Sequence, residues 1–161
     1  MTKVESIKES DAEDLVELFG NAGPYVSARS QSDYWLYARL FSTTCLCIRD
    51  DNGKPVAALI AFIDQTPGVD EIYIQDIAIR PEFRGRGLAT GMMTAIHDVA
   101  ARSLKRRIWL TSEPENLKAI SLWNRMGYQN LSADYKHNGI WITSDLKGPG
   151  RATGLKPSEK T

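Results

Sequence analysis

The sequence has few of the residues that form disulfides or metal sites. It contains two cysteines and two histidines among 161 residues. A single residue separates Cys45 from Cys47, which is too short a segment for an ordinary disulfide. His97 and His137 are far apart in the sequence and form no recognisable ligand pattern with the cysteines. We therefore expect two buried free thiols and no metal ion.

Net charge and long apolar runs are absent as well. Twenty basic residues balance twenty acidic ones, so no overall charge directs the protein to nucleic acid or to an anionic membrane. We find no apolar run of about eighteen residues and no charged start followed by an apolar stretch, so we expect neither a membrane span nor a signal peptide. These absences favour a cytoplasmic protein. With 42% hydrophobic residues, the chain can form one globular domain, expected at residues 1–146, followed by a polar tail at 147–161.

A strand, a tight turn and a long helix are predicted in the middle of the chain. Ile72–Ile79 is rich in β-branched residues, as buried strands are, and Pro81 ends the run. From Leu88 to about Ser103, apolar residues recur at spacings of three and four, as on one face of a helix. One residue interrupts the apolar strand. Asp76 places a carboxylate there, and an ionised carboxylate in apolar surroundings costs free energy unless a partner stabilises it. Such a position therefore also indicates a candidate functional group.

The turn between this strand and helix has the features of an anion site. Backbone N–H groups in the first turn of a helix lack intrahelical partners and carry the positive end of the helix dipole. Two glycines allow close approach and positive φ, and two arginines add positive charge. The sequence of the turn is Arg84-Gly85-Arg86-Gly87-Leu88-Ala89-Thr90. Thr90 excludes a dinucleotide fingerprint, and the chain has no Gly-Lys-Ser/Thr of a P-loop.

This turn resembles the Gln/Arg-x-x-Gly-x-Gly/Ala pyrophosphate signature of the GNAT superfamily of acyl-CoA-dependent N-acetyltransferases. The segment from Asn116 to Tyr128 is similar to the family's Asn-x-x-Ala-x-x-Leu-Tyr-x-x-x-Gly-Phe pattern. The resemblance implies an α/β fold with a central mixed, mostly antiparallel sheet flanked by helices. It also implies acetyl-CoA as acyl donor, an amine as acceptor and no covalent enzyme intermediate. Dimerisation is common in this family, so a homodimer is one expectation for the assembly.

The resemblance also assigns residues to the acyl donor. The strand before the turn would hold the pantetheine arm through its backbone, and a backbone N–H near Ile77 would serve as oxyanion donor. Asn116 matches the family's asparagine near the pantetheine, although helix capping accounts for this residue too. The expected donor-binding residues are Ile77, Ala78, Ile79, Arg84, Gly85, Arg86, Gly87, Leu88, Ala89, Thr90 and Asn116.

Acetyl transfer to an amine requires removal of a proton from the ammonium form, and a carboxylate can take it. Asp76 is the first candidate, and backbone amides at a strand irregularity are the structural alternative. Glu113, just after the next strand, is the second candidate, and a plain residue at the start of a helix is its alternative. The stretch from Tyr73 to Asp76 also resembles the Tyr-Leu-Glu-Asp sequence of the diamine and polyamine branch, with Gln75 replacing glutamate.

The proton donor for the leaving thiolate departs from the family pattern. Trp123 stands where the family has a tyrosine, and an indole N–H has no comparable acidity. Tyr128, Tyr135 and water are the candidates that remain, with Tyr128 as the one we assign. The other alternative is that the thiolate leaves unprotonated and is neutralised in solvent.

The acceptor is predicted from the loop and helix at residues 21–41, which cover the acceptor site in the resembling family. The candidates for substrate contact are Tyr25, Asp33, Tyr34, Tyr37 and Gln75, and the alternative for the aromatic ones is packing within the helix. Six acidic residues could form a pocket that fits a small cationic amine, such as a diamine, a polyamine or an aminoglycoside-like molecule, although acids scattered over the surface would give the same pattern in the sequence. They are Asp33, Asp64, Asp70, Glu71, Asp76 and Glu113. A protein or peptide amine and a non-catalytic acyl-CoA sensor remain alternatives.

Short patterns predict the remaining elements. A first strand lies at residues 4–7, and Ser10-Asp11-Ala12-Glu13 reads as a capping box for a helix ending at Gly20. Ser32 is expected to cap a second helix. The other elements are a hairpin of residues 44–49 and 55–63 around Asn52-Gly53, a turn at 66–68, a strand at 107–111, a helix at 116–125 and a final strand pair at 128–131 and 139–143.

Overall fold

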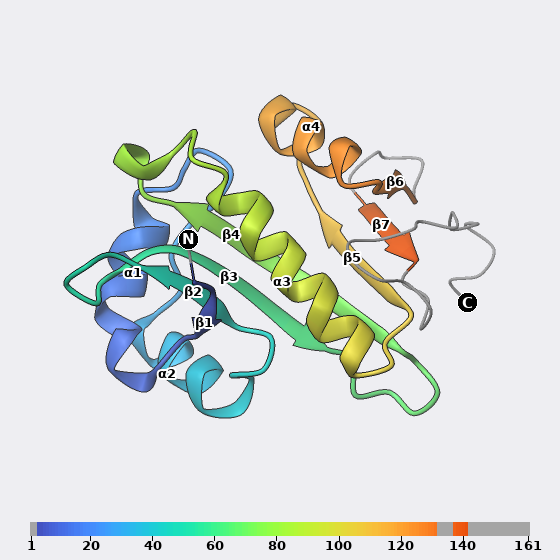
Figure 1. Ribbon diagram of the computed structural model, residues 1–161, viewed down its shortest axis with the longest axis horizontal. Helices are drawn as coiled ribbons and strands as arrows, with labels where there is room; N and C mark the ends of the chain where they lie inside the picture. The colour runs from blue at the N-terminus through green and yellow to red at the C-terminus, as the bar shows by residue number, and fades with distance from the viewer. Residues whose placement is uncertain (1–2, 132–136, 142–161) are drawn as a thin grey trace. The chain divides into compact units, whose positions relative to one another are not determined.

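The computed structural model describes residues 3–131 and 137–141. Within these residues, strands form a sheet in the order β1-β2-β3-β4-β5-β7-β6, and α-helices flank it (Figure 1). The strands are β1 (Glu5–Ser6), β2 (Leu46–Arg49), β3 (Pro55–Ile63), β4 (Glu71–Ile79), β5 (Arg107–Thr111), β6 (Gln129–Asn130) and β7 (His137–Trp141). The helices are α1 (Ala12–Gly20), α2 (Gln31–Leu40), α3 (Leu88–Arg102) and α4 (Leu117–Arg125), with short 3₁₀ turns η1 (Glu9–Asp11) and η2 (Pro81–Phe83).

The sheet is mixed, as the resemblance implied. β4 and β5 pair in parallel, from Glu71 opposite Arg107 to Ile74 opposite Leu110. The pairs β1–β2, β2–β3, β5–β7 and β6–β7 are antiparallel. The expected fold class is therefore confirmed. No described helix has both the length and the apolar character needed to cross a membrane.

The described chain divides into two compact units. The first unit consists of the residues up to Phe62 together with Gln75–Ala95. The second consists of Ile63–Ile74 and the described residues from Ile96 onward. The single domain expected at residues 1–146 stays a prediction. The tail at 147–161, Tyr135 and the end of the final strand pair at 142–143 lie outside the described residues.

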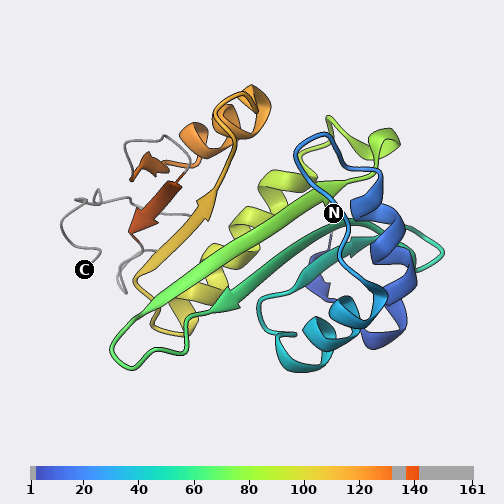
Figure 2. The ribbon, with the colours of Figure 1, turned by 180° about the vertical axis from the view of Figure 1, so that it is seen from behind.

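In the first unit, α1 and α2 lie on one face of the strands and the first turns of α3 on the other (Figures 1 and 2). β3 is buried from Pro55 to Ala61, which explains why this strand reads as a continuous apolar run without alternation. Cys45 and Cys47 join the apolar cluster under the two helices, and both are free thiols. Burial raises the pKa of Cys45 to about 12 and that of Cys47 to about 11. The expectation of buried free thiols is confirmed.

Both predicted helix caps were wrong by a few residues. A 3₁₀ turn precedes α1, and the Asp11 carboxylate accepts the Lys8 backbone N–H at 2.7 Å, so Ser10 caps no helix. At α2, Ser30 takes the position expected for Ser32. The Ser30 hydroxyl accepts the Asp33 N–H at 3.1 Å, and the Asp33 carboxylate accepts the Ser30 N–H at 3.3 Å. Ser30 has the extended backbone that a capping residue needs.

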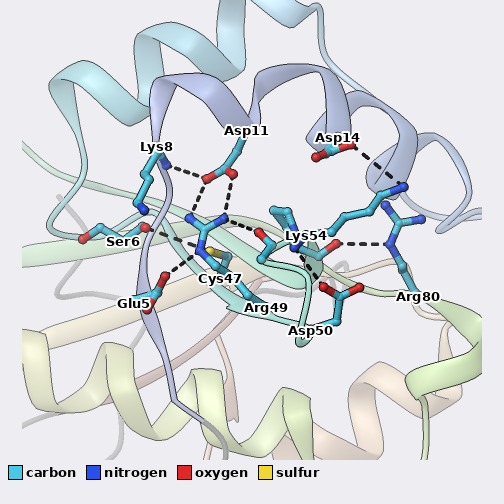
Figure 3. A network of polar contacts seen from close by, with 12 residues as sticks. Glu5, Ser6, Lys8, Asp11, Asp14, Cys47, Arg49, Asp50, Lys54 and Arg80 are labelled. Atoms are coloured by element: carbon cyan, nitrogen blue, oxygen red, sulfur yellow. Dashed lines mark hydrogen bonds and ion pairs between the residues drawn. The ribbon is translucent and has the colours of Figure 1, made fainter.

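An ion-pair network joins the start of the chain to the β2–β3 hairpin (Figure 3). The Arg49 guanidinium donates to both Asp11 carboxylate oxygens at 2.7 Å and to Glu5 at 2.5 Å. It also donates to the Gly53 carbonyl in the hairpin turn at 3.0 Å. Gly53 has a φ of +81°, the left-handed conformation that the predicted Asn-Gly turn requires. The network thus fixes η1 and β1 to the edge of the sheet.

The second unit is built on β5 and its neighbours. Trp109 packs against Tyr73 across the parallel pair, with ring centroids 4.5 Å apart, and Arg107 forms an ion pair with Glu71. Gly68, in the predicted turn before β4, has a φ of +82°. β5 matches its predicted range, and α4 begins one residue later than predicted because Asn116 is its cap.

Replacement of Arg49 by methionine should lower the free energy of unfolding by about 3 kcal/mol, because it would leave the Asp11 carboxylate buried and unpaired. Hydrogen bonds from Arg49 and Lys8 outweigh burial and lower the pKa of Asp11. The stability that Asp11 contributes is therefore present above its ordinary pKa and is lost as the pH falls through its lower folded value. Urea unfolding of the wild type and of Arg49→Met should show a difference in the free energy of unfolding, and this difference should become smaller in acid.

Arg39→Met is the matched control for this experiment. Arg39 pairs with Glu9 at 3.3 Å, but both side chains are exposed, so its loss should cost less than about 1 kcal/mol. Equal effects of the two substitutions would contradict a structural role for the Arg49 network.

Candidate active site

The turn after β4 has the backbone that an anion site requires. β4 ends at Ile79, η2 follows, and α3 begins at Leu88. Gly85 and Gly87 both have a φ of +77°, a conformation that residues with a side chain rarely adopt. The Gly91 N–H donates to the Gly87 carbonyl at 3.0 Å. The N–H groups of the three residues before Gly91 thus belong to the first turn, which has no intrahelical acceptors for them.

Space and charge at this turn also fit an anion. A Cβ added at Gly85 or Gly87 would meet nothing within 4 Å, so the turn is open at both residues. Residues 84–87 are exposed. The Arg84 Nε donates to the Ile79 carbonyl at 3.3 Å, and the Arg86 Nη2 donates to the Glu82 carbonyl at 3.2 Å. Arg86 also lies over the Phe83 ring, 4.9 Å from its centroid. Two restrained guanidinium groups therefore flank an open helix start.

The end of β4, which carries the predicted backbone contacts to pantetheine, is half-buried at Ile77 and Ile79. Ala78 belongs to the apolar cluster of the first unit, whereas Ile77 and Ile79 are half-buried. The register of the parallel pair reaches Leu110 opposite Ile74, and β5 ends one residue later, whereas β4 continues to Ile79. The predicted pantetheine contacts at Ile77–Ile79 thus lie beyond Glu71–Ile74, the part of β4 that pairs with β5.

Asp76 lies on the same face of β4 as Ala78 and has no strong partner. Its Oδ2 atom is buried and accepts no hydrogen bond from the described residues. The Arg29 Nε lies 3.9 Å from this oxygen, which makes an ion pair without a hydrogen bond. Burial raises the pKa of Asp76 to about 6, and the charge of Arg29 opposes this shift. The backbone amides considered as its alternative do not reach Oδ2.

Gln75 holds the Arg29 guanidinium. In the amide orientation that matches donors with acceptors, the Gln75 oxygen accepts from Arg29 Nε and Nη2, each at 3.2 Å. Gln75 also interacts with Tyr37, whose pKa is raised by burial and by the nearby Asp33 charge and lowered by its hydrogen bond with Gln75. The structure thus brings Gln75, Tyr37 and Asp76 together around a residue that the sequence analysis missed.

Tyr34 fixes the loop that carries Arg29. Its side chain is fully buried and stacks on Phe19, with ring centroids 5.4 Å apart. The Tyr34 hydroxyl accepts the Arg29 backbone N–H at 2.9 Å. Burial raises the pKa of Tyr34 to about 12, so this hydroxyl keeps its proton at physiological pH. The side chain of Tyr34 therefore supports the loop, which agrees with the packing alternative, and substrate contact by Tyr34 stays a prediction.

Several of the acidic residues predicted to surround the acceptor have partners within the fold. Asp33 caps α2 together with Ser30. Asp64 accepts the Thr66 N–H at 2.8 Å within its own turn. Asp70 lies 3.9 Å from Arg106, and Glu71 pairs with Arg107. Asp33, Asp64 and Glu71 thus have partners within the fold, and an acidic pocket for the acceptor stays a prediction.

The other predicted residues have less defined positions. Tyr25 is 45% exposed on the loop between α1 and α2. Glu113 is exposed in the second unit, where its carbonyl accepts the Asn116 N–H at 3.0 Å. The Asn116 side chain accepts the Ala119 N–H and caps α4, so the capping alternative is observed. Substrate contact by Tyr25, a catalytic role for Glu113 and a donor contact by Asn116 stay predictions.

The candidate proton donor of the second unit is engaged with a histidine. The Tyr128 hydroxyl lies 2.9 Å from His97 Nε2, and both residues are buried. Burial lowers the pKa of His97 to about 4 and raises the pKa of Tyr128 well above 10. Trp123 is buried beside Tyr128, and its Nε1 has no hydrogen-bond partner among the described residues. Which of the two atoms, the Tyr128 hydroxyl oxygen or His97 Nε2, donates depends on the tautomer of His97, and the role of Tyr128 as an acid stays a prediction.

Comparison with known proteins gives the same fold and a family. The sequence profile of the acetyltransferase (GNAT) family matches residues 11–128, which include parts of both units. Ard1 from Thermoplasma volcanium has a similar structure, with a TM-score of 0.74, 14% identity and coverage of 91% of this chain and 99% of that chain.

Two curated relatives are more similar in sequence but are matched over part of their length. The L-2,4-diaminobutyric acid acetyltransferase of Streptomyces coelicolor is 30% identical over 95 residues, which are 58% of this chain and 55% of the relative. The N-alpha-acetyltransferase 30 of Schizosaccharomyces pombe is 32% identical over 88 residues, which are 54% of this chain and 59% of the relative. The chain thus spans less than two thirds of these relatives.

Replacement of Arg29 by glutamine should raise the pKa of Asp76 above its value of about 6, because the guanidinium charge favours the ionised carboxylate. An NMR titration of the Asp76 carboxyl carbon measures this value directly. Arg39→Gln removes the same charge from an exposed part of α2 and should leave the titration unchanged. An unchanged Asp76 titration in the Arg29 variant would show that the two groups are not coupled in solution.

Proposed function

The chain belongs to the acetyltransferase (GNAT) family, and from this membership we propose that it transfers the acetyl group of acetyl-CoA directly to a primary amine of a small cationic molecule. One observation carries the proposal. A single strand, β4, bears a half-buried carboxylate at Asp76 and leads into the open, positively charged turn at residues 84–90. An amine-activating group and an anion site are thus joined by a short, rigid segment.

The acyl donor would be held mainly by backbone groups. The pyrophosphate would bind the N–H groups at the start of α3, with Arg84 and Arg86 supplying positive charge. Backbone groups of Ile77, Ala78 and Ile79 would hold the pantetheine arm, with a backbone N–H near Ile77 as the oxyanion donor. Acetyl-CoA supplies an acyl thioester, so the protein has to position the two substrates and manage protons.

Asp76 is suited to accept the proton of the attacking amine. Its pKa of about 6 leaves it ionised at neutral pH and close to the range in which a general base works best. The deprotonated nitrogen forms a bond to the acetyl carbon, the carbon–sulfur bond breaks, and CoA leaves as a thiolate that takes up a proton. Both cysteines are buried with raised pKa values, which supports direct transfer without an acyl-cysteine intermediate.

The two curated relatives point to different acceptors. The name of the Streptomyces coelicolor relative specifies a small diamino acid, and this similarity supports a small acceptor. The Schizosaccharomyces pombe relative is an N-alpha-acetyltransferase, and its similarity supports a protein or peptide amine as the second candidate. A sensor that binds acetyl-CoA without turnover is the third, because Trp123 replaces the family's tyrosine. A panel of small amines, amino acids and short peptides separates the three.

Replacing Arg84 and Arg86 together by glutamine should weaken acetyl-CoA binding by about tenfold or more, because two charge-assisted contacts to phosphate would be lost. Isothermal calorimetry gives the dissociation constant, and raising the salt concentration should reduce the difference. Arg39→Gln again serves as the control for loss of an exposed positive charge. An unchanged affinity in the double variant would place the pyrophosphate elsewhere.

Replacing Asp76 by asparagine should reduce kcat by about a hundredfold or more, the usual contribution of a general base. Glu113→Gln should change kcat by less than about threefold if Asp76 is the base. Release of free CoA thiol from acetyl-CoA in the presence of an accepted amine measures both. For the wild type, kcat/KM should fall as the pH drops through about 6, where Asp76 becomes protonated. The opposite ranking of the two variants would transfer the role to Glu113.

A further inference from the structure

The ion-pair partner of the candidate base Asp76 is a cation, Arg29. A cation at this position does not suit an acceptor whose only charged groups are ammonium groups. A guanidinium beside Asp76 repels such a molecule and attracts an anionic group on it. Resting on the proposed acetyl transfer, we propose that Arg29 binds a carboxylate of the acceptor, so that the acceptor is a small amino acid with its amine directed at Asp76.

The Arg29 guanidinium has donors to spare. The side chain is 47% exposed, and the Gln75 oxygen takes one hydrogen bond each from Nε and Nη2. A guanidinium has five N–H donors in a planar fork. Among the described residues, the remaining donors of Arg29 have no hydrogen-bond acceptor. A carboxylate can take two of them side by side, the geometry in which arginine binds carboxylates best.

The position of Arg29 is fixed from three sides. The buried Tyr34 hydroxyl holds its backbone N–H at 2.9 Å. Ser30, the next residue, is fixed by its reciprocal hydrogen bonds with Asp33 at the start of α2. Gln75 holds the guanidinium itself. Such support is expected of a group that must be in place before a ligand arrives, and a solvated surface arginine does not need it.

A purely structural partnership between Arg29 and Asp76 would have a different geometry. The same unit contains such a partnership, in which Arg49 donates to both Asp11 oxygens at 2.7 Å and lowers the pKa of Asp11. Arg29 stays 3.9 Å from Asp76 and leaves Oδ2 without a hydrogen bond. Both groups therefore keep capacity for further partners. An ammonium for Asp76 and a carboxylate for Arg29 are the two charged groups that every amino acid carries.

Matched pairs of substrates test this inference. Each pair consists of an amino acid and the amine that remains after loss of its carboxylate: lysine and cadaverine, ornithine and putrescine, alanine and ethylamine. Release of CoA thiol is measured for wild type, Arg29→Gln, Arg29→Lys and the control Arg39→Gln. We expect wild type to prefer the amino acid of at least one pair, and Arg29→Gln to lower its kcat/KM by about tenfold or more.

The amine of the same pair should keep its kcat/KM or gain in the Arg29→Gln variant, because a repelling cation has been removed. Arg29→Lys keeps the charge without the fork and should fall between wild type and Arg29→Gln. Arg39→Gln should leave the ratio of the two substrates unchanged. A merely structural role of Arg29 would lower both members of a pair equally and leave their ratio unchanged.

Three results would overturn the inference. Equal losses for both members of every pair, or a wild-type preference for the amines, would overturn it while acetyl transfer stands. Turnover of short peptides without turnover of free amino acids would also overturn it and favour the peptide alternative. Acetyl-CoA binding without thiol release for any amine, amino acid or peptide would overturn the proposed function itself, and the inference with it.

Discussion

A carboxylate whose buried Oδ2 atom accepts no hydrogen bond from any residue that the structure describes, in the middle of an apolar strand, is the constraint on which the candidate site depends. Asp76 is mostly buried, and its raised pKa corresponds to a cost of roughly 3 kcal/mol for keeping it ionised at neutral pH. This cost exists above a pH of about 6 and disappears below the ordinary pKa of an aspartate. A fold of ordinary stability can carry one such cost, and burial of this kind is typical of functional groups.

The same unit shows how the chain treats a carboxylate that has only a structural task. Asp11 is as buried as a core residue, yet it receives two hydrogen bonds from Arg49 and one from the Lys8 backbone. The two aspartates have arginines beside them, and the difference lies in a distance of 2.7 Å against 3.9 Å. The first geometry stabilises the ionised carboxylate and lowers its pKa, whereas in the second burial outweighs the arginine and the pKa is raised. Proximity of opposite charges in a sequence or a structure therefore does not by itself indicate which task they have.

The sequence predicted the strand, turn and helix at the centre well, because each rests on local chemistry. The β-branched run, the proline and the paired glycines specify β4, η2 and the positive φ values within a few residues of one another. The caps were less predictable, since Ser30 and Ser32 lie on either side of Gln31, the first residue of α2, and only the backbone angles decide which of them is the cap. Arg29 could not be found at all. Its position depends on Tyr34 beneath the loop and on Gln75, a residue far along the chain.

Counting acidic residues overlooked the partners that several of them have within the fold, for a related reason. Asp33, Asp64 and Glu71 each satisfy a local donor or a neighbouring arginine, and their charges are thereby assigned to the fold. Asp76 and Arg29 contribute one negative and one positive charge, which cancel. The whole chain also has no net charge, so neither the protein nor this part of it offers long-range attraction for a polycation. Discrimination among amines would then rest on the spacing of two opposite charges, a property that composition does not contain.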